Sequence, residues 1–149
     1  MPRFEVTRRT SLPADHAFAR VTDWKRHGDF LPLTSVSSSS ESPGGRMVAF
    51  NARTALGPVG FDDPMEVTTW RRPTHHEPGV ARLVKRGRVV HGWAVITVTP
   101  TAEGASVSWV EDAHLRLVGP LLNWPTRLVA RLTFGRLIDG LLAGSTAGR

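Results

Sequence analysis

The sequence contains no cysteine and no tyrosine, and only two of its 149 residues are lysine. The absence of cysteine excludes disulfides, thiol catalysis and thiolate metal sites. The absence of tyrosine removes one common general acid. Hydrophobic residues make up 40% of the chain and charged residues 21%, which is typical of a globular protein rather than a disordered one. We therefore expect a single domain over residues 1–149 that needs no metal or disulfide for stability.

No uncharged stretch is long enough to cross a bilayer. The most hydrophobic region, residues 115–142, is interrupted by arginines and by Asp139, whereas a membrane span needs roughly 20 apolar residues. The first residues, Met1 to Val6, alternate between polar and apolar and lack the apolar core of a signal peptide. These features predict a protein without a membrane span and with a cytoplasmic location.

The net charge is +6, and 17 arginines carry most of the positive charge. They are scattered, with the densest groups at Arg8-Arg9, at Arg71-Arg72 and within residues 82–88, which include Lys85. A nucleic-acid-binding protein usually concentrates basic residues on one face and adds exposed aromatics or a reading helix. We interpret the arginines as a solvated surface and expect no nucleic-acid partner. Nucleic-acid binding would gain support if residues 71–72 and 82–88 formed one continuous face.

Turn residues and hydrophobic periodicity divide the chain into a strand, two short helices, a series of strands and a long helix. Alternation predicts a strand over residues 3–9, Pro13 opens a helix, and a second helical segment runs from Trp24 to Phe30. A turn is expected at the serine run Ser37 to Ser40 and the following Pro43 to Gly45. The remaining strands are expected at residues 33–37, 47–54, 59–70, 81–86, 89–99 and 105–115. Their short connections favour an antiparallel meander.

Two apolar stripes follow each other along the C-terminal helix. The first consists of Leu121, Leu128 and Leu132. The second, rotated by more than a quarter-turn on a helical wheel, consists of Phe134, Leu137, Ile138 and Leu141. A straight helix cannot bury both stripes against one sheet. We therefore expect either a break near Gly135 or a contact of the second stripe with another subunit, as in a homodimer.

On the predicted strands, two carboxylates share a face with apolar side chains. Glu111 is in phase with Trp109 on one strand, and Asp63 is in phase with Phe61 on another. Small residues on the neighbouring strand, including Gly92, leave space for a pocket, and a mostly apolar pocket with few polar groups is the usual form of a ligand site. The candidate ligand-binding residues are Phe50, Phe61, Asp63, Met65, Ala94, Trp109, Glu111, Leu128 and Leu132.

Asp63 and Glu111 are also the candidate catalytic residues, because burial can bring a carboxyl group into the range useful for proton transfer. The other interpretation is that each accepts hydrogen bonds from an arginine or the backbone and closes the pocket wall. We favour this second interpretation because no histidine is in phase beside them. His91 is out of phase, and His16 and His114 are expected to be structural or solvated.

The sequence has no glycine-rich phosphate loop, no Gly-x-Ser-x-Gly elbow and no His-Glu-x-x-His zinc helix. The run His75-His76-Glu77 contains metal-ligating residue types, but it lies between Pro73 and Pro78 in a predicted loop. Adjacent side chains on an extended chain point apart. We therefore expect neither a metal site nor a cofactor.

Four segments resemble the SRPBCC (START-like, polyketide cyclase/dehydrase) superfamily. The segment from Pro13 to Trp24 looks like its first helix, and three others are similar to segments of its bacterial members: Leu56 to Met65, Gly87 to Gly92 and Val107 to Glu111. The resemblance implies an α+β helix-grip fold, in which a curved antiparallel sheet of about seven strands wraps around a long C-terminal helix. It also implies a hydrophobic cavity between sheet and helix.

The expected function is binding of a small hydrophobic ligand, such as a lipid or a polyketide, in that cavity. The alternative is a polyketide cyclase/aromatase-type enzyme in which Asp63 or Glu111 transfers a proton on a polyketide-like or ketone substrate. A nucleic-acid binder that uses its basic surface is the second alternative.

Overall fold

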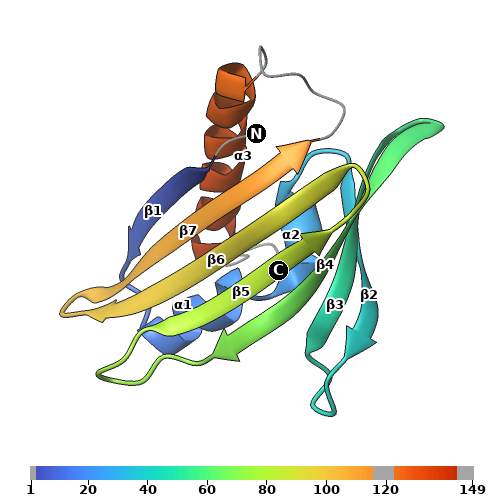
Figure 1. Cartoon of the computed structure of the whole chain (residues 1–149). Helices are drawn as coiled ribbons and strands as arrows, with labels where there is room; N and C mark the ends of the chain where they lie inside the picture. Colours follow the sequence, from blue (N-terminus) through green and yellow to red (C-terminus); the bar gives the residue numbers. More distant parts are fainter. Residues whose placement is uncertain (1–2, 116–122, 144–149) are drawn as a thin grey trace, which may run out of the picture.

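The computed structural model describes residues 3–115 and 123–143 (Figure 1). In chain order its elements are β1 (Phe4–Thr10), α1 (Ala14–Val21), α2 (Trp24–Phe30), β2 (Thr34–Glu41), β3 (Met47–Leu56), β4 (Val59–Arg71), β5 (Gly79–Arg86), β6 (Val90–Thr101), β7 (Gly104–Leu115) and α3 (Asn123–Ala143).

The seven strands form one antiparallel sheet in the order β1-β7-β6-β5-β4-β3-β2. Strands β2 to β7 form a meander, and β1 joins its far side by pairing with β7, so that Val6 lies opposite Trp109. The sheet curves, and α3 lies on one side of it while α1 and α2 lie near its end (Figure 1). The expected α+β helix-grip fold is therefore confirmed.

The serine run is the main place where the predicted elements differ from the structure. The predicted strand ended at Ser37, with Ser38 to Ser40 in a turn, but β2 continues to Glu41, and Ser38 and Ser40 pair with Phe50 and Ala49 of β3. Because β2 is an edge strand whose serines beyond Val36 are exposed, they need no apolar side chains, and pairing with β3 outweighs the turn preference of serine.

The predicted strand faces are confirmed by burial. On β6 the side chains of Ala94, Ile96 and Val98 are buried, and on β7 those of Val107 and Trp109 are buried. These residues share the concave side of the sheet with the helices and form the hydrophobic core. Among the described residues, no helix combines the length and the apolar character that crossing a membrane requires.

The helix α3 corrects the expectation about its two stripes. The second stripe is the buried one: Leu137, Ile138 and Leu141 are fully buried, and Phe134 packs against the core. The first stripe faces solvent, since Leu128 is 50% exposed and Leu132 is 53% exposed. Leu121 lies outside the described residues.

Neither a helix break nor a second subunit is needed to explain the second stripe, because α3 runs unbroken through Gly135 and packs against β1, α1 and α2 of the same chain. At Gly135 the helix lies against the side chain of Arg8 instead. A Cβ atom at this position would lie 2.6 Å from Nη2 of Arg8 on β1. One turn further on, Asp139 accepts a hydrogen bond of 2.8 Å from Nε of Arg8, which pins the helix to the strand.

The orientation of α3 predicts that two leucine truncations differ strongly in their effect on stability. Leu137→Ala should lower the free energy of unfolding by about 2–5 kcal/mol, because it leaves a cavity in the core. Leu132→Ala should change it by less than about 0.5 kcal/mol, because the side chain is in solvent. Denaturant unfolding of both variants measures the difference, and equal losses would contradict the described orientation.

Candidate functional site

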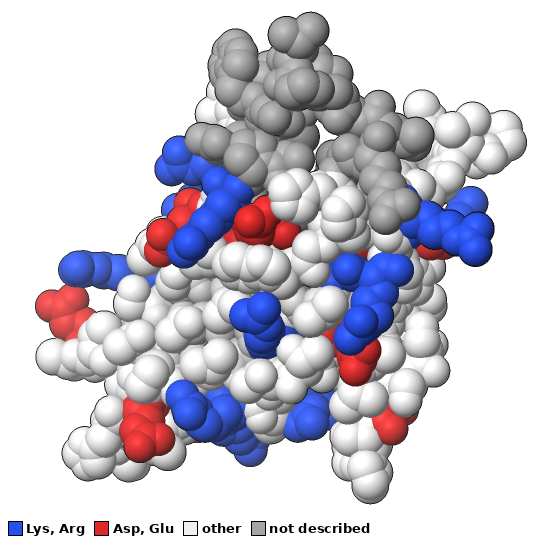
Figure 2. All heavy atoms as spheres, in the orientation of Figure 1, with Lys and Arg blue, Asp and Glu red and all other residues white. Residues whose placement is uncertain are grey.

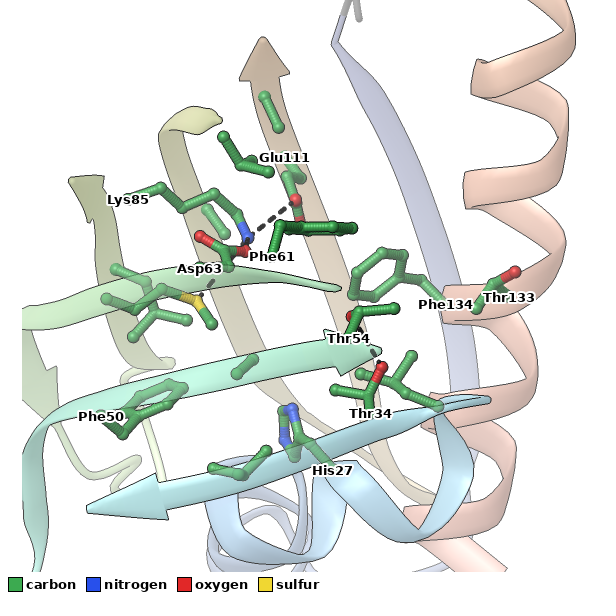
Figure 3. Close-up of a pocket in the computed structure, with 18 of the residues that line it drawn as sticks. His27, Thr34, Phe50, Thr54, Phe61, Asp63, Lys85, Glu111, Thr133 and Phe134 are labelled. Atoms are coloured by element: carbon green, nitrogen blue, oxygen red, sulfur yellow. Dashed lines mark hydrogen bonds and ion pairs between the residues drawn. The ribbon is translucent and has the colours of Figure 1, made fainter. Parts of the chain in front are cut away.

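A pocket of about 270 Å³ lies between the concave face of the sheet, α2 and α3. Figure 3 shows side chains from β2, β3, β4 and α2 pointing into it, with Thr133 and Phe134 of α3 at its edge. Seven of the predicted ligand-binding residues line it: Phe50, Phe61, Asp63, Met65, Ala94, Trp109 and Glu111.

Leu128 and Leu132 do not line the pocket, contrary to the prediction. Both belong to the stripe of α3 that faces solvent, and the helix presents Thr133 and Phe134 to the pocket instead. The error arose because helical periodicity shows which residues share a face but not which of two faces meets the sheet.

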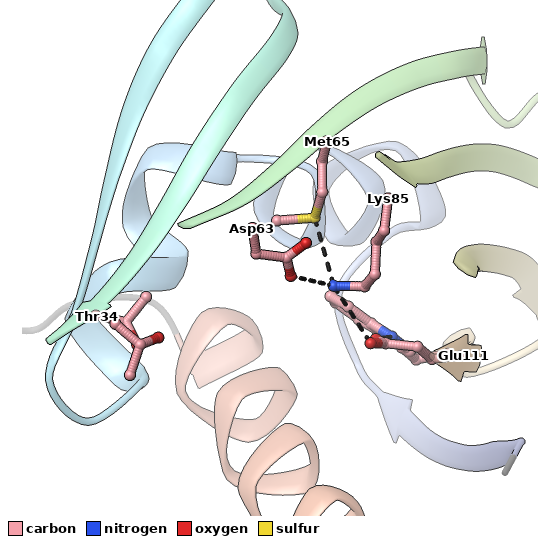
Figure 4. Close-up of polar contacts among 7 residues, drawn as sticks. Thr34, Asp63, Met65, Lys85 and Glu111 are labelled. Carbon is pink, nitrogen blue, oxygen red and sulfur yellow. Dashed lines mark hydrogen bonds and ion pairs between the residues drawn. The ribbon is translucent and has the colours of Figure 1, made fainter. Parts of the chain in front are cut away.

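The two predicted carboxylates belong to a buried ionic cluster around Lys85 (Figure 4). The ammonium of Lys85 donates to Oδ2 of Asp63 at 2.6 Å and lies 3.4 Å from Oε1 of Glu111. It also lies 3.6 Å from the sulfur of Met65, and Nε1 of Trp109 donates to Oε2 of Glu111 at 3.0 Å. The side chains of Lys85, Asp63 and Glu111 are 6%, 13% and 3% exposed, so the cluster is shielded from bulk water.

The small side chain of Ala94 on β6 allows Lys85 to reach Glu111 as well as Asp63. Lys85 on β5 lies opposite Gly92, and Glu111 on β7 lies opposite Ala94. Gly92 has a positive φ of 142°, and a Cβ atom there would clash with the carbonyl oxygen of Asp112 on β7, so the close approach of these two strands requires glycine. The lysine side chain bridges from β5 toward β7 past Ala94. Part of the space that the small residues were expected to leave for a ligand is therefore occupied by the lysine.

Sequence reasoning missed Lys85 because it was grouped with the arginines of residues 82–88 as surface charge. A signal was available, since Ala81, Leu83 and Lys85 alternate along β5 and all three are buried. Arg86 follows the opposite phase and pairs with Glu66 on the exposed face. Strand phase is thus a better guide to this lysine than charge density.

Burial lowers the pKa of the Lys85 ammonium, but the neighbouring carboxylates of Glu111 and Asp63 more than offset this effect. The net result is a pKa raised above the ordinary value of lysine. Lys85 therefore remains a cation throughout the neutral range. A nucleophilic lysine requires the opposite shift.

His27 is a second pocket residue that sequence reasoning missed, and Figure 3 shows its ring reaching into the pocket from α2. Its Nε2 lies 2.9 Å from the carbonyl oxygen of Val21. Because a carbonyl only accepts hydrogen bonds, Nε2 carries the proton and Nδ1 has a free lone pair. The expectation concerned histidines on the strands, whereas α2 brings His27 into the same pocket from outside the sheet.

Burial lowers the pKa of His27 to about 4. The hydrogen bond to Val21 opposes this effect, and the charge of Lys85 adds to it. The imidazole is consequently neutral at pH 7. It also packs against aromatic rings, with centroid distances of 5.2 Å to Trp24 and 5.6 Å to Trp109.

The other histidines lie away from the pocket. The side chain of His16 is 66% exposed, and the half-buried His91 stacks on His114 at a centroid distance of 5.3 Å. His75-His76-Glu77 lies exposed in the loop between β4 and β5. Within residues 3–115 and 123–143, no group of three or more histidines or carboxylates is arranged to hold a metal ion.

The outer face of the sheet carries its basic residues in separate groups. Figure 2 shows lysines and arginines of this face divided by uncharged and acidic side chains. Arg82 lies over the ring of Trp93 at 5.3 Å, so part of this charge is engaged with an aromatic ring. Arg72 lies over the ring of Trp70 at 5.6 Å, but that ring packs against Phe18 of α1 and belongs to the helix side of the sheet. The outer face does not present the continuous basic surface on which nucleic-acid binding would depend.

This chain matches one protein-family model, and its fold is similar to that of several solved structures. A family model described as "Polyketide cyclase / dehydrase and lipid transport" matches residues 1–146. No curated protein sequence matches significantly. A structure from Chromobacterium violaceum has a TM-score of 0.68 at 15% identity and covers 96% of each chain.

Two further solved structures have similar folds. A START superfamily protein from Mycobacterium smegmatis has a TM-score of 0.65 at 12% identity, covering 93% of this chain and 98% of its own. An aromatase/cyclase from Streptomyces has a TM-score of 0.60 at 14% identity, covering 98% of this chain and 97% of its own. At such identities the likeness establishes the fold alone.

Loss of the buried cation should destabilise the protein strongly. In Lys85→Met, two carboxylates remain buried without a counter-charge, and the free energy of unfolding at pH 7 should fall by about 3–5 kcal/mol. The deficit should shrink as the pH is lowered, because protonation relieves an uncompensated buried carboxylate. The matched control is Lys25→Met, which removes the other lysine at an exposed position on α2. Equal stability of the two variants in urea would contradict the ionic cluster.

Because His27 is buried as a neutral imidazole, we expect the free energy of unfolding to fall as the pH is lowered from about 6.5 to about 4. The unfolded chain takes up this proton below the ordinary pKa of 6.5, but the folded protein does so only near 4, so acid favours unfolding over that interval. The cost reaches on the order of 3 kcal/mol. ¹⁵N NMR titration of the imidazole in the folded protein measures the pKa directly, and a value near 6.5 would contradict the prediction.

Proposed function

This chain belongs to the polyketide cyclase/dehydrase and lipid-transport family within the SRPBCC superfamily, and we propose that it binds a small, largely apolar molecule in the pocket between sheet and α3. The observation that carries the proposal is the composition of the wall. Aromatic and aliphatic side chains dominate it, and its charged groups are already paired with one another. A mostly apolar cavity with few oriented polar groups is the usual form of a small-molecule site.

The volume limits the size of the ligand. An apolar cavity of about 150 Å³ binds benzene, so a pocket of about 270 Å³ suits a molecule with on the order of ten heavy atoms. A bicyclic aromatic, or a segment of a longer chain, meets this limit. Trp109 and Phe134, whose ring centroids are 5.1 Å apart, offer an aromatic surface against which a flat ligand can pack.

The protonation states of the pocket residues support binding rather than covalent or acid–base chemistry. Lys85 is held as a cation and cannot act as a nucleophile while protonated. His27 is neutral, but a pKa of about 4 makes it a weak base at pH 7, where a general base is most effective with a pKa close to the pH. Neither residue is therefore suited to covalent or acid–base chemistry at neutral pH.

A cyclase/aromatase-type enzyme remains the alternative, since the carboxylates of Asp63 and Glu111 lie in the pocket wall. Its test is turnover of aromatic polyketide precursors. If Asp63→Asn or Glu111→Gln abolished product formation while ligand affinity was kept, the enzymatic alternative would replace pure binding.

Filling the pocket should prevent binding. Ala52 of β3 lines the pocket, and Ala55 on the same strand points to the opposite side of the sheet. We expect Ala52→Leu to weaken binding at least about tenfold through steric exclusion, whereas Ala55→Leu should bind like the wild type. Tryptophan fluorescence, with Trp109 in the pocket wall, measures titrations of bicyclic aromatics and of lipids with one acyl chain.

One control and one negative outcome complete that experiment. Trp109→Phe identifies the part of the fluorescence signal that comes from the pocket. The proposal would be abandoned if no apolar compound changed either the fluorescence or the melting temperature of the folded wild-type protein.

A further inference from the structure

The N–H groups of the ionic cluster around Lys85 all donate hydrogen bonds to other residues of the protein. The Lys85 ammonium has three hydrogens and three neighbours that accept them: Asp63, Glu111 and the sulfur of Met65. The indole N–H of Trp109 donates to Glu111. None of these groups therefore has a hydrogen left for a ligand.

The hydroxyl groups that β2 and β3 contribute to the pocket also donate their hydrogens to other residues of the protein. Thr34 donates to the carbonyl oxygen of Pro32 at 3.0 Å, and its hydroxyl lies 3.0 Å from that of Thr54. Because the hydrogen of Thr34 is already used, Thr54 must be the donor in the second bond. Of the described side chains that line the pocket, Thr133 alone retains an uncommitted hydrogen, and as a hydroxyl it accepts as readily as it donates.

Unused acceptors remain. Nδ1 of His27 carries a lone pair and has no hydrogen-bond partner among the residues of the described chain, although the side chain is 94% buried, at 6% exposure. Oδ1 of Asp63 is buried and likewise lacks a partner in that part of the chain. The cluster also contains two carboxylates and one ammonium, which leaves an excess of negative charge when all three are ionised.

We infer that the pocket selects a neutral ligand whose polar group donates a hydrogen bond, such as a phenol or another alcohol, and that Nδ1 of His27 accepts this bond. The inference rests on the proposed function and specifies the ligand's chemical class. A ketone or an ether would leave the lone pair of His27 unpaired in a buried site. A carboxylate would in addition face the excess negative charge of the cluster.

Four naphthalene derivatives of suitable size separate these possibilities: naphthalene, 2-naphthol, 2-methoxynaphthalene and 2-naphthoate. At pH 7 the phenol is neutral and the carboxylic acid is ionised. Isothermal titration calorimetry on the wild-type protein should show 2-naphthol binding at least about tenfold more tightly than 2-methoxynaphthalene, with 2-naphthoate the weakest.

Two further measurements assign the acceptor. The ¹⁵N resonance of the unprotonated His27 nitrogen should shift toward that of the protonated nitrogen when 2-naphthol is added, but not when 2-methoxynaphthalene is added. In His27→Phe, the preference for the phenol over its methyl ether should fall to about twofold or less while naphthalene still binds. His16→Phe, at an exposed position on α1, should keep the full preference. The resonance measurement on the wild type decides the question if His27→Phe does not fold.

The outcomes separate this inference from the proposed function. If the methyl ether or the carboxylate binds as tightly as the phenol, or if the His27 resonance does not respond, the inference is overturned and apolar ligand binding stands. If none of the four compounds binds, the proposed function is overturned together with the inference.

Discussion

The ammonium of Lys85 and the carboxylates of Asp63 and Glu111 form the interaction on which the pocket depends. These side chains come from β5, β4 and β7, so their ion pairs tie together strands that are not all neighbours in the sheet. A buried charge is stabilised only where its counter-charges and hydrogen bonds are in place. The positions of the three side chains are therefore mutually dependent, and they set both the floor of the pocket and its electrostatic character.

The rest of the fold creates the conditions for this cluster. Ala94 on the intervening strand β6 has a small side chain, past which the lysine reaches from β5 toward Glu111 on β7. The helix α3 covers the concave side with its second apolar stripe and shields it from bulk water, and the hydrogen bond from Arg8 to Asp139 links the helix to β1. With water excluded, each polar group in the pocket must find its partner within the protein or in a ligand.

This requirement connects the structure to its proposed function. Apart from Thr133, the described donors of the pocket are used in internal hydrogen bonds, while Nδ1 of His27 and Oδ1 of Asp63 keep lone pairs in a mostly apolar pocket. A site of this kind is suited to recognising a molecule and poorly suited to moving protons at neutral pH. Family membership allows binding, transport and cyclisation, and the state of the pocket residues is the evidence that favours binding for this chain.

Hydrophobic periodicity in the sequence determined the strands, the inward phase of Asp63, Trp109 and Glu111, and the position of the long helix, because each depends on the local repeat of a strand or a helix. Tertiary structure alone decided which stripe of α3 is buried, since both stripes satisfy the same helical pattern. It also decided the role of Lys85, whose burial becomes favourable only when carboxylates from two other strands surround it. His27 enters the pocket from a separate helix, and such a meeting of distant segments depends on chain topology, which local patterns do not encode.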